Sequence, residues 1–151
     1  MIEVLGKARN KRELRPCILE AFSVYQEALD QLNAGRVPPD QLVVNGKVSY
    51  ALEAYRSSTA AVRAARQMEA AGMSIRPGQR IRFLYTIGDQ DVFAWDLGKV
   101  FDPALLNKAR YIELLAKAGG SVLLPFGIDP KLLMEWSVRG GVQLMLKDCL
   151  I

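Results

Sequence analysis

The chain has 151 residues, half of them apolar, with 20 lysines and arginines against 16 aspartates and glutamates. This length suits one domain with a hydrophobic core, and no apolar run approaches the roughly 20 residues that span a bilayer. Because the chain has no histidine, Ser–His and Cys–His nucleophile systems and histidine-based metal sites are excluded. The charged N-terminus lacks the apolar region of a secretory signal, so we expect a cytoplasmic protein.

The residue pattern in the first third of the chain predicts a strand, a helix and a second strand. Residues 2–5 form a short β-like run. Apolar residues then recur at spacings of three and four, which predicts an amphipathic helix over about 13–34 with Pro16 in its first turn and Gly35 after its end. Residues 42–44 are strand-like, and Asn45-Gly46 predicts a turn.

The remaining elements alternate in type. An alanine-rich helix is expected from Ser57 or Ser58 to Gly72. The period-two pattern of residues 80–86 predicts a strand that pairs with residues 92–95. Helices should follow over about 104–124, interrupted near Gly119-Gly120, and from Pro130 to 138. This order predicts an α+β fold that is mostly helical.

Buried positions are expected for several large or apolar side chains. Cys17 should pack as a small hydrophobe, and a disulfide between the two cysteines is not expected in a cytosolic protein. Four aromatic side chains are expected in the core rather than in base stacking: Phe83, Tyr85, Trp95 and Trp136.

Basic residues are clustered although the net charge is only +4. One cluster lies in residues 7–15, a second is Arg76, Arg80 and Arg82, and a third comprises Lys47, Arg56, Arg63 and Arg66. Clustered cations are typical of a phosphate-binding surface. A solvated face without a partner would have the same composition, and both interpretations stay open.

Two aspartates deserve a separate interpretation. Asp89 and Asp91 stand two residues apart, as in the metal-binding motif of polymerase active sites, where paired carboxylates share Mg²⁺. A second aspartate-bearing strand would be needed, and none is obvious. Gly88-Asp89-Gln90-Asp91 between two strand patterns is also ordinary turn chemistry. We therefore expect a hairpin loop, with no metal site and no cofactor.

Short motifs stand in order from residue 2 to about 128. They are Ile2-Glu3-Val4, Val37-Pro38-Pro39-Asp40, Glu53-Ala54-Tyr55-Arg56, Ala64-Ala65-Arg66-Gln67-Met68, residues 77–85, Ile87-Gly88-Asp89, Tyr111-Ile112-Glu113 and Pro125-Phe126-Gly127. Together this ordered set resembles the thumb of family B DNA polymerases with the last strand of the palm. Val37-Pro38-Pro39-Asp40 resembles the segment that opens that thumb, and Glu53-Ala54-Tyr55-Arg56 is similar to its Glu-x-Tyr-Lys.

This resemblance implies a DNA-gripping module without a catalytic centre, because the fingers, the exonuclease and the catalytic aspartates have no counterpart. It implies contacts with primer–template duplex through Lys47, Tyr55, Arg56, Arg63 and Arg66. Asn45-Gly46 and Ala60-Ala61 depart from the family pattern close to the DNA, which favours a diverged thumb.

The expected organisation is a palm-like strand with a connector (1–12), a thumb-like domain (13–138) and a tail (139–151). Met1 directly before the palm-like strand favours a separately encoded subunit of a split polymerase. An unpaired N-terminal strand would favour docking to a polymerase core or a homodimer. The alternatives are a protein–protein adaptor that has lost DNA binding and a free-standing DNA-binding protein.

The tail is compared with the sliding-clamp peptide at the end of many archaeal family B polymerases. Gln143 and Leu146 match that peptide in type and spacing, whereas Cys149 and Leu150 stand where two aromatic residues belong. The alternative is that the apolar residues of the tail pack on this domain or on a dimer mate.

Overall fold

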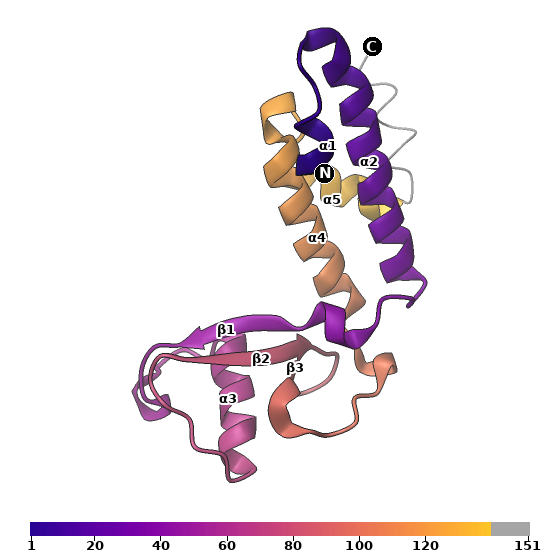
Figure 1. Cartoon of the computed structure of the whole chain (residues 1–151). Helices are drawn as coiled ribbons and strands as arrows, with labels where there is room; N and C mark the ends of the chain where they lie inside the picture. Colours follow the sequence, from indigo (N-terminus) through magenta and orange to yellow (C-terminus); the bar gives the residue numbers. More distant parts are fainter. Residues whose placement is uncertain (140–151) are drawn as a thin grey trace. The chain divides into compact units, whose positions relative to one another are not determined.

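The computed structural model describes residues 1–139 (Figure 1), which form two compact units. One unit comprises Met1–Arg36 and the chain from Lys108 onward, and the other is Val37–Asn107. The first is built from helices, and the second contains a small antiparallel sheet with one helix. The predicted α+β, mostly helical fold class is therefore confirmed.

The helical unit is organised around α2 (Lys11–Asn33) and α4 (Lys108–Leu123), which pack against each other. Helix α1 (Ile2–Leu5) contacts α2, and α5 (Pro130–Arg139) contacts α4. Helix α2 begins where the Asn10 side chain accepts the backbone N–H groups of Arg12 and Glu13, which satisfies two donors that a helix start leaves free. Pro16 consequently lies beyond the first turn of α2, not within it.

The end of α2 follows the prediction. Gly35 has a φ of +68°, a conformation that glycine adopts without a Cβ clash. The backbone N–H of Arg36 bonds the carbonyl of Gln31, and that of Gly35 bonds the carbonyl of Leu32. This is the Schellman arrangement, which satisfies the last carbonyls of the helix.

The core of the helical unit corrects the interruption predicted near Gly119-Gly120. Helix α4 continues through both residues, and both are buried. A Cβ atom on Gly120 would lie 2.5 Å from Cα of Pro130, and one on Gly119 would lie 2.9 Å from the Tyr25 ring. The two glycines therefore serve helix packing, because a larger residue would push α5 and Tyr25 away from α4.

The N-terminal strand prediction is wrong, since residues 2–5 form helix α1. Val4 is buried, and Met1 and Leu5 pack against the core of the helical unit. A helical turn places Met1, Val4 and Leu5 on one side, whereas a strand would point alternate residues in opposite directions. Among the described residues this unit contains no sheet that a strand could join.

The sheet of the second unit has the order β1–β2–β3 and is antiparallel throughout. Its strands are β1 (Val44–Val48), β2 (Gln79–Tyr85) and β3 (Val92–Ala94), and α3 (Ala60–Ala70) covers one face. The predicted pairing of the strands around residues 80–86 and 92–95 is confirmed. Short 3₁₀ turns complete the described chain at Pro39–Leu42, Leu52–Ala54, Trp95–Leu97, Pro103–Leu105 and Leu124–Phe126.

The core between α3 and the sheet combines three alanines, Val62 and Met68 on the helix with apolar residues on the strands. Ala61, Ala64 and Ala65 are buried against Val48, Ile81 and Phe83. Of the four aromatic residues expected in the core, Phe83 and Trp136 are buried, whereas Tyr85 and Trp95 are half-buried. Cys17 is also only half-buried.

The turn predicted at Asn45-Gly46 does not exist, because both residues lie within β1. A Cβ atom on Gly46 would come within 2.5 Å of the Ala61 Cβ and 3.1 Å of the Phe83 ring. The glycine is therefore present because α3 crosses β1 at this point without room for a side chain.

Gln67 of α3 protects the free edge of β3. Its side-chain nitrogen donates to the carbonyl of Val92 at 2.8 Å, and its side-chain oxygen accepts the N–H of Ala94 at 2.9 Å. The carboxamide thus pairs with β3 much as the peptide group of another strand would. An unpaired edge invites association with other chains, so this contact closes the sheet at β3.

We predict that Gly46→Ala lowers the free energy of unfolding by about 1–3 kcal/mol, the usual cost of overpacking. Chemical denaturation measures the loss. Asn45→Ala is the matched control because Asn45 is the exposed neighbour in the same strand. Adding Ala61→Gly to Gly46→Ala should restore part of the stability, because the clashing Cβ is removed. If the changes in the free energy of unfolding caused by Gly46→Ala and Ala61→Gly were strictly additive, the two positions would not be in close contact.

A second prediction concerns Tyr25, whose hydroxyl lies 2.7 Å from Ser137 Oγ in the core of the helical unit. Ser137 donates its own proton to the carbonyl of Leu133, so Tyr25 is the donor to Ser137. Burial raises the pKa of Tyr25 above its usual 10.0. The folded protein therefore holds this proton at a pH where the unfolded chain releases it.

The contribution of Tyr25 to folding stability is fully present below pH 10, and it is lost as the pH rises through the raised pKa of Tyr25. We expect the melting temperature to decline above about pH 10, and Tyr25→Phe should reduce this decline while costing about 1 kcal/mol at neutral pH. Tyr50→Phe is the control, because Tyr50 is exposed. If the melting temperatures of Tyr25→Phe and Tyr50→Phe declined equally above pH 10, Tyr25 would not be the group that causes the decline.

Candidate nucleic-acid interface

Basic side chains gather on the face of the sheet opposite α3. Gly46 and Val48 of β1 face the helix, and alternation along the strand directs Asn45 and Lys47 to the other face. Lys47 is directly opposite Arg80 in the β1–β2 register, and Asn45 is opposite Arg82. We call these four residues the outer sheet face.

The arginines of this face differ in their partners. Arg82 is bonded to both carboxylate oxygens of Asp96, and that hydrogen bond, together with the charge of Asp96, raises the pKa of Arg82. Lys47 and Arg80 are exposed and form no ion pair within the described chain. Like charges directly opposite each other on a sheet repel, so an anion above this pair would relieve the repulsion.

Tyr55 and Arg56 lie at the same end of the β1–β2 ladder. The Tyr55 hydroxyl accepts the N–H groups of Ser49 at 2.7 Å and Tyr50 at 3.1 Å, just after β1. Two acceptor positions of the hydroxyl are then occupied, but its proton remains available for donation. Arg56 is the next residue and is exposed. The structure thus brings Tyr55 and Arg56 to the strand end that also carries Lys47.

Arg63 and Arg66 are placed elsewhere, on α3, which covers the other face of the sheet. Arg63 donates two parallel hydrogen bonds to Asp91, of 2.7 Å and 2.9 Å, and also bonds the carbonyl of Ser58. Arg66 is exposed. The five residues expected to contact DNA therefore occupy two surfaces, with Lys47 separated by the sheet from the two arginines of α3.

Arg80 was not among the expected contact residues, although its cluster with Arg76 and Arg82 is visible in the sequence. Its relation to Lys47 could not be predicted, because it depends on a strand register between residues 33 positions apart. The expected clamp-binding residues Gln143, Leu146, Cys149 and Leu150 lie outside the described residues.

The pair Asp89 and Asp91 lies in the turn between β2 and β3, as the hairpin interpretation predicted. Asp91 is bonded to Arg63, and its φ of 49° suits a tight turn. In the described chain, no three histidine, cysteine, aspartate or glutamate residues gather where they could hold a metal ion. No helix in that part of the chain is both long and apolar enough to cross a bilayer.

The chain is similar to DNA polymerases in sequence and in fold. Over 97 residues, 61% of this chain, the sequence is 32% identical to a DNA polymerase of Desulfurococcus sp. (strain Tok) and 31% identical to one of Thermococcus sp. (strain 9oN-7). A solved family B DNA polymerase of Pyrobaculum calidifontis shares the fold over 78% of this chain, with a TM-score of 0.63 and 19% identity. The chain resembles a piece of a family B DNA polymerase. No protein-family model matches it.

The resemblance stated from the sequence motifs is therefore confirmed at the level of the family. The chain spans only 12% of the length of the two archaeal polymerases and 16% of the solved one. The likeness accordingly concerns a domain derived from a polymerase. It does not extend to the activities of the whole enzyme.

We predict that Tyr55→Phe loosens the segment after β1, because the N–H groups of Ser49 and Tyr50 lose their acceptor. Both amides should exchange with solvent deuterium markedly faster, which NMR can follow residue by residue. Water replaces the lost bonds at this exposed site, so the cost in global stability should be at most about 1 kcal/mol. Tyr50→Phe is the control, since its hydroxyl accepts neither amide. Unchanged exchange at Ser49 and Tyr50 would refute the role of Tyr55.

Proposed function

We propose that this chain is a thumb module that grips double-stranded DNA through phosphate contacts and has no catalytic role of its own. The observation that carries this proposal is the unpaired, cross-strand juxtaposition of Lys47 and Arg80 on the outer sheet face. The resemblance to family B polymerases supports DNA as the source of the anion.

Phosphate recognition follows from the chemistry of these side chains. Arg80 and Arg56 can each bind a phosphate with two hydrogen bonds, whereas Lys47 acts as a point charge. The Tyr55 hydroxyl still has a proton to donate, and its position is set by the two backbone amides that it accepts. Such contacts neutralise phosphates without reading bases, so the binding should ignore sequence.

The remaining parts of a polymerase would supply the chemistry. Because the chain spans 12% of its archaeal relatives, we infer that residues 13–138 act as a thumb-like domain beside a polymerase core, as a separate subunit or as part of a longer chain. The helical form of residues 2–5 removes the argument for a homodimer through a shared strand. A clamp-binding role for the tail remains a prediction.

One observation favours a protein–protein adaptor as the second candidate. The helical unit has an apolar hollow of about 420 Å³ lined by Val24, Leu115 and Val122, beside the exposed side chain of Ile2. Exposed apolar surface of this kind is typical of protein contacts. An adaptor would bind a polymerase core through this surface and would not need the outer sheet face.

We expect the isolated chain to bind primer–template duplex with a dissociation constant of roughly 10⁻⁴ to 10⁻⁶ M, the range of non-specific binding. Fluorescence anisotropy at several salt concentrations measures both affinity and salt slope. Each phosphate contact contributes about 0.9 to the slope of log K against log salt. The double variant Lys47→Ala/Arg80→Ala should therefore reduce the slope by about 1.8.

The matched control is Arg82→Ala/Asp96→Ala, which removes a neutral ion pair from the same face and should leave the slope unchanged. Arg56→Ala should weaken binding to all duplex sequences equally. Absence of duplex binding at low salt would disprove the gripping function. Retention of a polymerase core by the same protein would then favour the adaptor.

A further inference from the structure

The segment that follows β3 folds back onto the sheet face opposite α3. Val92 and Ala94 pack toward α3, so alternation along β3 directs the Phe93 side chain to the other face. The Phe93 ring contacts that of Phe101, with ring centroids 5.0 Å apart. This contact holds residues 95–101 on the side of the sheet that carries the outer sheet face.

The far end of this segment is bonded to the end of β2. The N–H of Ile87 donates to the carbonyl of Leu105 at 2.8 Å, and the N–H of Asn107 donates to the carbonyl of Tyr85 at 3.0 Å. The sheet therefore fixes the segment at both ends. Asp96, in a short 3₁₀ turn near the start of the segment, has its backbone position set by these contacts.

Asp96 thereby meets Arg82 of the outer sheet face. The Arg82 Nε lies 3.0 Å from one carboxylate oxygen of Asp96 and 3.3 Å from the other, and Nη2 of Arg82 is also bonded to Asp96. The Asp96 side chain is 27% exposed and that of Arg82 is 53% exposed. The carboxylate is thus the more shielded partner, and it holds the more exposed guanidinium from below the surface.

Without this carboxylate, Arg82 would extend the cationic surface of Lys47 and Arg80. Two residues of a strand span roughly 6.6 Å, so Arg82 lies one step from Arg80 on the same face of β2. A free guanidinium at this position could bind a further phosphate with two hydrogen bonds. Asp96 occupies that guanidinium and places a negative charge where the phosphate would lie.

We propose that Asp96 determines how much of the outer sheet face is open to phosphate, by keeping Arg82 from contacting it. This inference rests on the proposed duplex function and deepens it, because it confines the contact to Lys47, Arg80 and the strand end beside them. Few phosphate contacts give weak binding that ignores sequence, which lets a protein slide along DNA. Asp96 would thus favour movement along the duplex over tight attachment.

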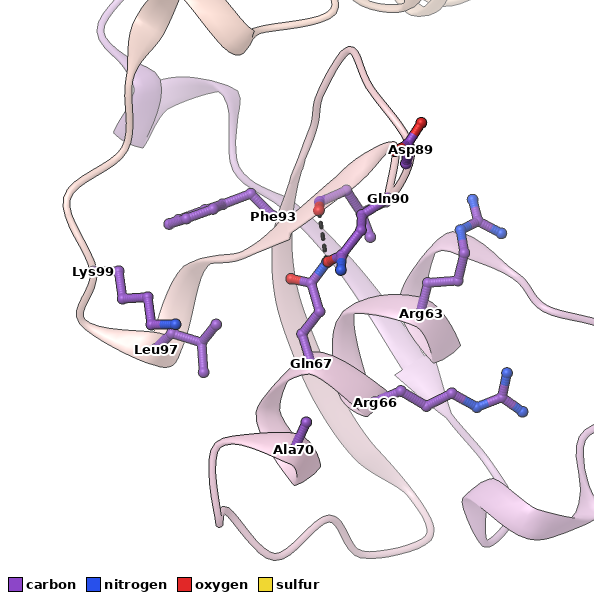
Figure 2. A pocket seen from close by; sticks show the side chains of 10 residues that line it. Arg63, Arg66, Gln67, Ala70, Asp89, Gln90, Phe93, Leu97 and Lys99 are labelled. Carbon is purple, nitrogen blue, oxygen red and sulfur yellow. Dashed lines mark hydrogen bonds between the residues drawn. The ribbon is translucent and has the colours of Figure 1, made fainter.

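The sheet unit contains a second pair of the same chemistry on its other face. Arg63 of α3 donates to both carboxylate oxygens of Asp91, and Figure 2 shows Arg63 extending from α3 on the side away from Phe93. Asp91→Asn therefore removes the same charge as Asp96→Asn and releases the same kind of side chain on the opposite side of the sheet. Asparagine tolerates the φ of 49° at this position.

The test is fluorescence anisotropy of the full chain with a labelled primer–template duplex at several salt concentrations. Asp96→Asn keeps the size of the side chain but not the charge that holds Arg82. It should strengthen binding roughly threefold to tenfold at low salt and steepen the slope of log K against log salt by about 0.9, the value of one phosphate contact. Asp91→Asn should change neither quantity. In an Arg82→Ala background, Asp96→Asn should bring no gain, because no arginine is released.

Equal gains with Asp96→Asn and Asp91→Asn would show a response to net charge and overturn the inference. A gain that persists in the Arg82→Ala background would overturn it as well. If the wild-type chain binds no duplex, the proposed function fails, and calorimetric titration with inorganic tripolyphosphate decides the inference on its own. Asp96→Asn should bind tripolyphosphate more tightly than Asp91→Asn does, and equal affinities of the two variants would overturn the role of Asp96.

Discussion

The close contact between α3 and the sheet is the constraint on which the sheet unit depends. Gly46 lacks a side chain where Ala61 crosses β1, and the rest of the buried helix face consists of Val62, Ala64, Ala65 and Met68. This spacing lets Gln67 reach the edge of β3 and lets Arg63 reach Asp91 in the hairpin turn. On the opposite face of the sheet, Lys47 and Arg80 are exposed, whereas Leu84 further along β2 is fully buried.

Pairing with acidic residues decides which of the basic residues remain available. Asp91 neutralises Arg63 and Asp96 neutralises Arg82, although both arginines belong to clusters that look alike in the sequence. Lys47 and Arg80 remain unpaired among the described residues, opposite each other on the outer sheet face. An anion gains most where a cation has no carboxylate partner, because no existing ion pair must be broken first.

The likeness to family B polymerases is stronger in fold than in sequence. The fold matches over 78% of the chain at 19% identity to the solved polymerase. Family-like segments supply the turns and the core, while Asn45-Gly46 and Ala60-Ala61 depart from the pattern at the point where β1 meets α3. Two of these departures, Gly46 and Ala61, form the tightest contact of that crossing. They are explained by packing, and so they carry less weight as signs of lost DNA binding.

The sequence by itself determined the fold class, the end of α2 at Gly35, the β2–β3 pairing and the likeness to a polymerase piece, because period, turn chemistry and motif order are local signals. Long-range contacts decided the rest. Residues 2–5 became helical because Val4 is buried and Met1 and Leu5 pack on the core of the helical unit, where α1 contacts α2. Gly119-Gly120 continued α4 because Pro130 and Tyr25 needed the space. The pairing of Lys47 with Arg80, and the neutralisation of Arg63 by Asp91, depend on strand register and helix placement. Neither can be read from spacing along the chain, since each joins residues that only the folded backbone brings together.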